Sequence, residues 1–276
     1  MKLKPISYFW QSNIRIWFFC TFNLSKKKVM DIRHYLDSTY LKTPEQAGLS
    51  VAENTKIVKS FIKEAIDEKF KLIMIRPDMV KLAKKMITNA NSKLTIGTVI
   101  GFHEGTHSLE AKLTEAQKAI EDGADDLDFV CNYEAFKKGE VDLVKKEILE
   151  GTKIGLAHHK IVKWIIEVAA LNSDQIIQMS TLIKNVVMAH FKEECYASVF
   201  VKSSTGFYKT ENGLPNGATV PTIIMMLENG SPLSIKAAGG VRTYDEAMAM
   251  IQLGVKRIGT SSAKAIVNGQ TTTSEY

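Results

Sequence analysis

Hydrophobic and polar positions follow one repeating rhythm from about residue 30 to the end of the chain. Short runs of apolar, β-branched residues alternate with longer segments that carry a single apolar stripe. Several of the short runs are apolar on both faces, as in parallel strands that helices cover. The pattern predicts eight strands, over residues 34–38, 71–75, 94–100, 126–132, 161–168, 198–203, 233–238 and 256–260.

The segments between these strands have the period of amphipathic helices. Apolar residues return at helical spacing over residues 111–120 and 173–191. A third helix is predicted over 243–253, with Thr243 as its N-cap and Glu246 completing a capping box. Glycines stand where helices are expected to end, at Gly123, Gly151 and Gly254.

Eight strand–helix units without a clear linker predict one (β/α)8 TIM barrel. A doubly wound open sheet is the alternative, but no Rossmann glycine motif opens near the first strand. The chain has 276 residues, of which 45% are hydrophobic, so it is able to bury a large core. This composition excludes a disordered chain.

The basic charge of the chain is concentrated at one end. The net charge is +6, and residues 1–29 hold six Lys and Arg residues and no acid. The remainder is therefore neutral, which argues against nucleic acid as a partner.

Residues 1–29 do not follow the strand–helix rhythm, and their longest apolar run, 16–22, is too short to cross a membrane. We interpret them as an extension that precedes a domain over residues 30–276, and one hypothesis is that translation starts at Met30. The cysteines are odd in number and widely spaced, at Cys20, Cys131 and Cys195. This pattern is typical of a reduced protein, so we expect a cytoplasmic location and no membrane partner.

Ionisable residues occur within the predicted strands and at their carboxyl ends, where a barrel places its active site. Asp37 and Thr39 end the first strand. In the fourth strand, a period of two puts Asp126 and Asp128 on one face. We expect this face to point away from the helix layer.

Three lysines lie in otherwise apolar strands, although lysine disfavours full burial. Lys202 and Lys236 each precede a loop of small residues, and Lys163 lies in the fifth strand. One interpretation is a buried ion pair with an acid such as Glu167 or Asp128. The other is covalent catalysis, because burial and a second cation lower the pKa of a lysine toward the neutral, nucleophilic form. Asp128 would then carry protons through a water molecule.

The loops after the last two strands are rich in glycine and hydroxyl groups. Gly239 and Gly240 follow the seventh strand, and Ser261 and Ser262 follow the eighth, just before a short predicted helix. Loops at these positions form the usual phosphate site of a barrel. The alternative is a pair of ordinary loops without a ligand.

Five motifs together resemble the deoxyribose-phosphate aldolase family, in the family's order and over about residues 31–268. They are LDSTYLK (36–42), GADDLDFV (123–130), KWIIE (163–167), VKSSTG (201–206) and KAAGGVRT (236–243). The resemblance implies a class I aldolase that cleaves 2-deoxy-D-ribose 5-phosphate to acetaldehyde and D-glyceraldehyde 3-phosphate, with no metal or other cofactor.

The resemblance also implies roles for individual residues. Lys202 would form the Schiff base, Lys236 would perturb it, and Asp128 would relay protons. The substrate-binding residues implied are Asp37, Thr39, Lys163, Thr205, Gly206, Gly239, Gly240, Ser261 and Ser262. The last residue, Tyr276, resembles a terminal tyrosine that folds over the site in some members.

Some positions depart from the family's pattern. Residues 74–77 read Met-Ile-Arg-Pro in place of Cys-x-x-Pro, and 102–105 read Phe-His-Glu-Gly in place of Phe-Pro-x-Gly. Val168 stands where threonine is common. These changes concern the pocket wall, so they affect substrate tolerance more than reaction type.

Parts of the sequence are also consistent with other functions. Residues 103–107 match the H-E-x-x-H zinc pattern, but they follow a strand and contain Gly105, so no zinc site is expected. A transaldolase-like Schiff-base enzyme and a catalytically silent phosphate-binding barrel stay open. The expected partners are small sugar phosphates and aldehydes, and a homodimer is one option.

Overall fold

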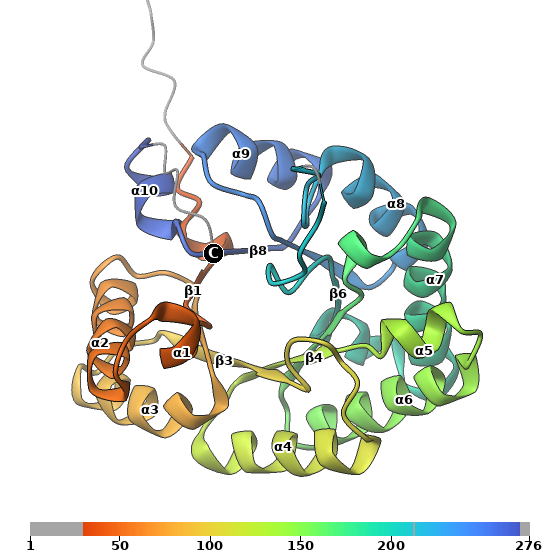
Figure 1. Cartoon of the computed structure of the whole chain (residues 1–276), viewed down its shortest axis with the longest axis horizontal. Coiled ribbons are helices and arrows are strands. Elements are labelled where there is room, and N and C mark those ends of the chain that lie inside the picture. Colours follow the sequence, from red (N-terminus) through yellow and green to blue (C-terminus); the bar gives the residue numbers. More distant parts are fainter. Residues whose placement is uncertain (1–29, 212, 271–276) are drawn as a thin grey trace, which may run out of the picture. The chain divides into compact units, whose positions relative to one another are not determined.

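The structure is a computed structural model that describes residues 30–211 and 213–270, so the interpretations of residues 1–29 and Tyr276 lie outside the described residues. Eight parallel strands close into one barrel in chain order (Figure 1). They are β1 (Leu36–Thr39), β2 (Leu72–Ile75), β3 (Thr95–Ile100), β4 (Asp126–Val130), β5 (Ile161–Ile165), β6 (Val199–Lys202), β7 (Ser234–Ala238) and β8 (Arg257–Thr260). The predicted TIM barrel is confirmed, and the open sheet is excluded because β1 pairs with β8.

Helices surround the barrel on its outer side (Figure 1). They are α1 (Pro44–Ala47), α2 (Val51–Asp67), α3 (Val80–Asn89), α4 (Leu109–Asp122), α5 (Tyr133–Lys137), α6 (Val141–Ala157), α7 (Ser173–His190), α8 (Val220–Gly230), α9 (Tyr244–Leu253) and α10 (Ala263–Val267). Over the residues that the structure describes, no helix combines the length and the apolar character needed to cross a membrane.

The predicted start of α9 is confirmed in detail. The Thr243 side chain accepts a hydrogen bond from the Glu246 N–H, and the Glu246 carboxylate accepts one from the Thr243 N–H. This reciprocal pair is a capping box. Gly123 and Gly254 end α4 and α9 in the left-handed conformation, as predicted.

The prediction that Gly151 ends a helix is wrong, because Gly151 lies in the middle of α6. A Cβ atom at this position would lie 2.7 Å from Cη2 of Trp164. The glycine therefore reflects the close approach of α6 to the indole ring on β5, and packing outweighs its low helix propensity.

Three predicted strands extend two or three residues too far at one end. Residues 33–35 form a short 3₁₀ helix before β1, whereas the pattern predicted strand from residue 34. Strand β4 stops at Val130, since Asn132 becomes the N-cap of α5. Strand β5 stops at Ile165, and Glu167 adopts a positive φ of 54°, a conformation that ends extended structure.

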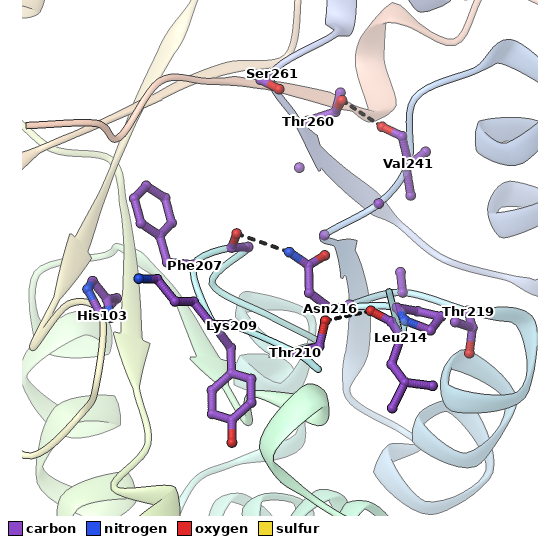
Figure 2. A pocket seen from close by; sticks show the side chains of 18 of the residues that line it. His103, Phe207, Lys209, Thr210, Leu214, Asn216, Thr219, Val241, Thr260 and Ser261 are labelled. Carbon is purple, nitrogen blue, oxygen red and sulfur yellow. Dashed lines mark hydrogen bonds between the residues drawn. The ribbon is translucent and has the colours of Figure 1, made fainter. Parts of the chain in front are cut away.

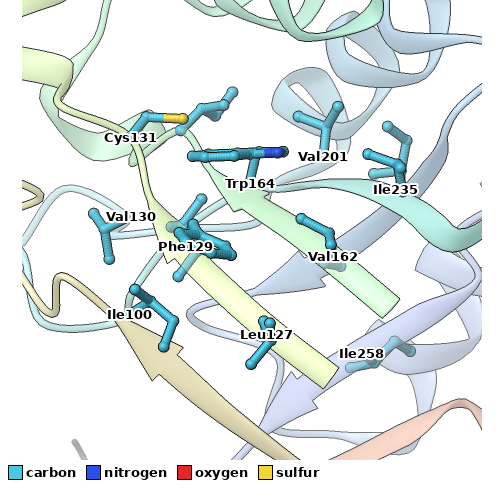
Figure 3. Close-up of a cluster of buried hydrophobic side chains, with 14 of the residues drawn as sticks. Ile100, Leu127, Phe129, Val130, Cys131, Val162, Trp164, Val201, Ile235 and Ile258 are labelled. Atoms are coloured by element: carbon cyan, nitrogen blue, oxygen red, sulfur yellow. The ribbon is translucent and has the colours of Figure 1, made fainter. Parts of the chain in front are cut away.

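The main core lies between the barrel and the helices (Figure 3). Phe129 and Trp164 stack there with ring centroids 4.9 Å apart, and Trp164 Nε1 donates a hydrogen bond to Thr152. Cys131 is buried in the same core. Because successive side chains of a strand alternate in direction, these outward residues leave the inward positions of β4 and β5 for polar groups.

Candidate active site

Charged side chains from six strands meet inside the barrel and form one buried network. They are Asp37 on β1, Asp126 and Asp128 on β4, Lys163 on β5, Lys202 on β6, Lys236 on β7 and Arg257 on β8. The strand register places them together: Lys163 pairs with Asp128 across β4 and β5, and Lys202 pairs with Lys236 across β6 and β7.

Asp128 is the centre of this network. Its Oδ1 accepts a hydrogen bond from Lys163 Nζ at 2.8 Å, and its Oδ2 accepts one from each of Lys202 and Lys236 at 2.9 Å. Burial alone would raise the pKa of the Asp128 carboxyl, but the charges of the three lysines outweigh it and hold that pKa well below its usual range. Asp128 is therefore an ionised carboxylate that bridges two lysines through one oxygen.

The three lysines differ in how many carboxylates compensate their charge. Lys163 also contacts Asp126 at 2.6 Å, and Lys236 also contacts Asp37 at 2.6 Å. Within the described chain, the carboxylate at ion-pair distance from Lys202 is Asp128 alone, through the oxygen shared with Lys236. Lys202 is thus the least compensated cation of the three.

This difference separates the pKa of Lys202 from that of Lys163. Burial lowers the pKa of Lys202 to about 8, against the attraction of Asp128 and with the help of the nearby Lys236 charge. Burial acts the same way on Lys163, but Asp126 and Asp128 outweigh it and raise that pKa. A pKa of about 8 leaves part of Lys202 uncharged near neutral pH, which nucleophilic attack by an amine requires.

Both interpretations of the buried lysines thus describe part of the site. All three lysines form ion pairs with Asp128, as the first interpretation expected. Lys202 nevertheless has the lowered pKa that the second one needs.

Glu167 holds the loop after β6, and the suggestion that it pairs with a lysine is wrong. Its carboxylate accepts hydrogen bonds from the Ser204 hydroxyl at 2.8 Å and from the Thr205 N–H at 3.1 Å. The Thr205 hydroxyl, which the family resemblance assigned to substrate, also donates to Glu167. Burial raises the pKa of Glu167. These contacts fix the backbone directly after Lys202.

A cavity of about 1300 Å³ lies among the loops that follow the strands. Figure 2 shows His103, Phe207 and Lys209 on one side of it and Thr260 and Ser261 on another. Of the predicted substrate residues, four line the cavity: Gly206, Gly239, Gly240 and Ser261. The others are buried outside its lining, namely Asp37, Thr39, Lys163, Thr205 and Ser262.

Lys202 is the lysine of the network that keeps some accessible surface. Its side chain is 4% exposed, whereas those of Lys163 and Lys236 are 0% exposed. The next residues along the chain lead from Lys202 to Gly206 in the cavity wall. Lys202 is therefore the lysine of the network whose side chain is not fully enclosed.

Glycines bring the loops of the cavity wall close together. A Cβ atom on Gly217 would lie 2.5 Å from Gly239 Cα, so the two backbones touch. A Cβ atom on Gly259 would lie 3.2 Å from Lys236 Cε, so this glycine makes room for the lysine. The Thr260 hydroxyl joins the last two loops by donating to the Val241 carbonyl at 2.8 Å.

The H-E-x-x-H segment at residues 103–107 lies in the loop between β3 and α4. Its two histidines therefore do not share a helical face, which the zinc-protease arrangement requires. Among residues 30–211 and 213–270, no group of three or more His, Cys, Asp or Glu side chains is arranged to hold a metal ion.

Arg257 belongs to the network but was not predicted from the sequence. Its Nε donates a hydrogen bond to Asp37 Oδ1 at 2.7 Å, and its Nη2 lies 3.3 Å from Asp126 Oδ2. A signal was present, since an arginine two residues before Gly259 in an apolar strand lies on the same inward face.

Comparison with known proteins identifies the family of the chain. Residues 35–269 match the family model described as DeoC/LacD family aldolase. The chain is 39% identical over 241 residues to the deoxyribose-phosphate aldolase of Thermococcus gammatolerans, covering 87% of this chain and 96% of that protein. It is 34% identical to the deoxyribose-phosphate aldolase of Streptococcus gordonii, covering 90% of this chain and 100% of the relative.

Solved structures give the same result. The aldolase QR15 superposes with a TM-score of 0.71 at 29% identity, covering 87% of this chain and 95% of that chain. The deoxyribose phosphate aldolase of Aeropyrum pernix, described as tetrameric, superposes with a TM-score of 0.67 at 25% identity, covering 85% and 88%. The chain therefore belongs to the DeoC/LacD aldolase family.

Proposed function

We propose that the chain is a deoxyribose-phosphate aldolase that cleaves 2-deoxy-D-ribose 5-phosphate to acetaldehyde and D-glyceraldehyde 3-phosphate through a Schiff base on Lys202. The observation that carries this proposal is the side chain of Lys202. It is a buried amine with a pKa of about 8, at the end of β6, four residues before Gly206 in the wall of a cavity large enough for a sugar phosphate. The family and the names of its relatives support the substrate.

The reaction begins when the neutral Nζ of Lys202 attacks the C1 aldehyde carbon of the open-chain sugar. The resulting carbinolamine loses water and becomes a protonated imine. Asp128 contacts Lys202 at 2.9 Å, so its carboxylate is placed to move protons through a water molecule in this step. Lys236 contacts the same carboxylate oxygen, and its charge helps to lower the pKa of Lys202.

Cleavage follows from the protonated imine. A proton leaves the C3 hydroxyl, the C2–C3 bond breaks, and its electron pair moves toward the imine nitrogen. Glyceraldehyde 3-phosphate departs and an enamine remains on Lys202. Protonation of the enamine at C2 gives the imine of acetaldehyde, and addition of water then releases acetaldehyde and the free amine.

The phosphate group is assigned to the loops after β6, β7 and β8. Gly206, Gly239, Gly240 and Ser261 line the cavity and support this placement. The five-residue helix α10 is too short to contribute a strong dipole, so the assignment depends on the loops. Ser262 would act from behind the wall, because its N–H donates to Thr260 Oγ1 at 3.0 Å.

The remaining predicted residues would act on the network. Asp37 and Lys163 are partners of Lys236 and Asp128, and the Thr39 hydroxyl donates to the Asp37 carbonyl at 2.8 Å. We further propose a domain over residues 30–276 that follows an extension at 1–29, supported by the family match over 35–269. A cytoplasmic location and a homodimer stay predictions.

The test is a coupled assay for glyceraldehyde 3-phosphate, together with borohydride trapping of acetaldehyde and mapping of the modified peptide. We expect cleavage of deoxyribose 5-phosphate and an adduct on Lys202. An adduct with ketose phosphates alone would instead favour a transaldolase-like enzyme. The absence of any adduct and of any cleavage would favour a barrel that only binds phosphate ligands.

A further inference from the structure

The charged network inside the barrel contains one more cation than anion. Three carboxylates and four basic side chains are joined by contacts of 2.5 to 3.3 Å. The carboxylates are Asp37, Asp126 and Asp128, and the basic groups are Lys163, Lys202, Lys236 and Arg257. Because a buried uncompensated charge is costly, loss of one proton from this network is favoured.

That proton must come from a lysine. An arginine guanidinium does not lose its proton in proteins. Arg257 opens β8, and its partner Asp126 opens β4, so the pair lies at the amino end of the barrel. The cavity is lined by residues that follow the carboxyl ends of the strands, and Arg257 is not part of its lining. Arg257 is therefore a fixed charge without access to substrate.

Arg257 competes with two lysines for their carboxylates. Asp37 is divided between Arg257 on Oδ1 and Lys236 on Oδ2. Oδ2 of Asp126 contacts both Arg257, at 3.3 Å, and Lys163, at 2.6 Å. Lys236 and Lys163 therefore each depend on Asp128 for part of the negative charge that balances them. Lys202, which has Asp128 alone, is left short of negative charge.

We propose that Arg257 is a positioning residue that makes Lys202 the neutral lysine, by supplying the surplus positive charge of the network from the end opposite the substrate. The inference rests on the proposed Schiff-base role of Lys202. It adds that the reactivity of this amine is set by the charge balance of the whole barrel interior as well as by its neighbour Lys236.

The groups that face Lys202 come from every adjoining element. Asp128 on β4, Lys163 on β5 and Lys236 on β7 are its charged neighbours in the network. Glu167, which follows β5, is also close enough for Lys202 to affect its pKa, but its carboxylate is held by Ser204 and Thr205. None of these groups is altered in the test below.

The test measures the pH dependence of acetaldehyde trapping at Lys202 by cyanoborohydride, in the full chain, for the wild type and four variants. Arg257→Gln removes the surplus cation, so the midpoint of the rise in trapping should move up by about 1 pH unit or more. Arg257→Lys keeps the charge and changes the geometry, so its midpoint should stay near that of the wild type. Asp126→Asn removes an anion and should move the midpoint down.

The double variant Arg257→Gln/Asp126→Asn restores a surplus of one cation and should return the midpoint to within a few tenths of a pH unit of the wild type. It also removes both ends of one contact, so no buried charge is left without a partner there. This makes it the variant to use if Arg257→Gln alone does not fold, as judged by circular dichroism. Opposite shifts in the single variants and their cancellation in the double variant would support the proposal.

An unchanged midpoint in Arg257→Gln, or equal shifts in Arg257→Gln and Arg257→Lys, would overturn it. So would a double variant whose midpoint differs from that of the wild type by as much as either single variant. Failure of the proposed function has another signature, since the wild type would then release no glyceraldehyde 3-phosphate from deoxyribose 5-phosphate.

Discussion

Two buried lysine–carboxylate sites flank the end of β4, one outside the barrel and one inside it. Outside, Lys112 of α4 and Glu147 of α6 lie 3.0 Å apart with side chains that are 1% and 2% exposed. Lys112 also donates to the Val130 carbonyl at 3.0 Å, and Glu147 accepts from the Asn132 N–H at 3.3 Å. Inside, Lys202 is buried to a similar degree but shares its one carboxylate oxygen with another lysine.

From this difference we expect that burial alone does not make a lysine reactive. At the outer site one cation faces one anion, and backbone groups satisfy further hydrogen bonds of both side chains. At the inner site the cations outnumber the anions, and burial then favours release of a proton. Charge balance therefore distinguishes a lysine that anchors the end of a strand from one that can attack a carbonyl.

The largest expected effect comes from replacing the inner lysine. Lys202→Met removes the amine that we propose forms the Schiff base, so kcat/KM for deoxyribose 5-phosphate should fall by about four orders of magnitude or more. The thermal midpoint should not fall, because the substitution removes the least compensated charge. The coupled assay and a thermal melt measure the two effects. Retention of more than a trace of cleavage would contradict the role of Lys202.

Replacing the outer lysine should lower the stability of the protein and leave the reaction at Lys202 unchanged. Lys112→Met leaves Glu147 buried without its ion-pair partner, so the free energy of unfolding should drop by about 3–5 kcal/mol. Denaturant titration measures this loss. Trapping at Lys202 should keep its wild-type pH midpoint, because the outer pair is not part of the inner network.

A matched control separates the charge from the packing at the outer site. In Lys112→Met/Glu147→Leu both charged groups are replaced, so much of the lost stability should return. If the double variant is no more stable than Lys112→Met, loss of packing rather than an unpaired charge would explain the effect, and the comparison of the two sites would fail.

The fold was accessible from the sequence because its signals are local. Apolar runs, helical stripes and caps such as Thr243 each act over a few residues, and all eight strands lie where the pattern placed them. Predictions failed where a distant contact overrides a local preference. Gly151 is the example, because its place in α6 depends on Trp164, which is distant in sequence.

The site was accessible in part for the same reason. Lysines and aspartates in apolar strands stand out one at a time, so Lys202, Lys236 and Asp128 could be singled out from the sequence, and the structure brings them into one buried network. The ion pairs between these residues could not be predicted, since a sequence does not show which carboxylate faces which amine across the barrel. Arg257 was not predicted because its proposed role depends on the number of charged groups in the whole barrel interior and not on a motif.

A smaller effect is expected where substrate is bound rather than attacked. Ser261 lines the cavity in the loop after β8. Ser261→Asp adds a negative charge there, so KM for deoxyribose 5-phosphate should rise by about tenfold through repulsion of the phosphate. KM for 2-deoxyribose without phosphate serves as the control and should not rise. Equal changes for both substrates would place the phosphate elsewhere.

The last expected effect requires a change of pH and no mutation. Schiff-base formation requires the neutral amine, and a lysine becomes neutral as the pH rises through its pKa. With a pKa of about 8 for Lys202, acetaldehyde trapping should increase about tenfold for each pH unit between 6 and 7 and level off above about 9. Lys112 should acquire no adduct over this range, because its charge is matched and its amine is held by Glu147 and a backbone carbonyl. A midpoint near the ordinary lysine value of about 10.4 would mean that the surplus cation of the barrel does not act on Lys202, and the different charge balance of the inner and outer sites would then not explain the reactivity of Lys202.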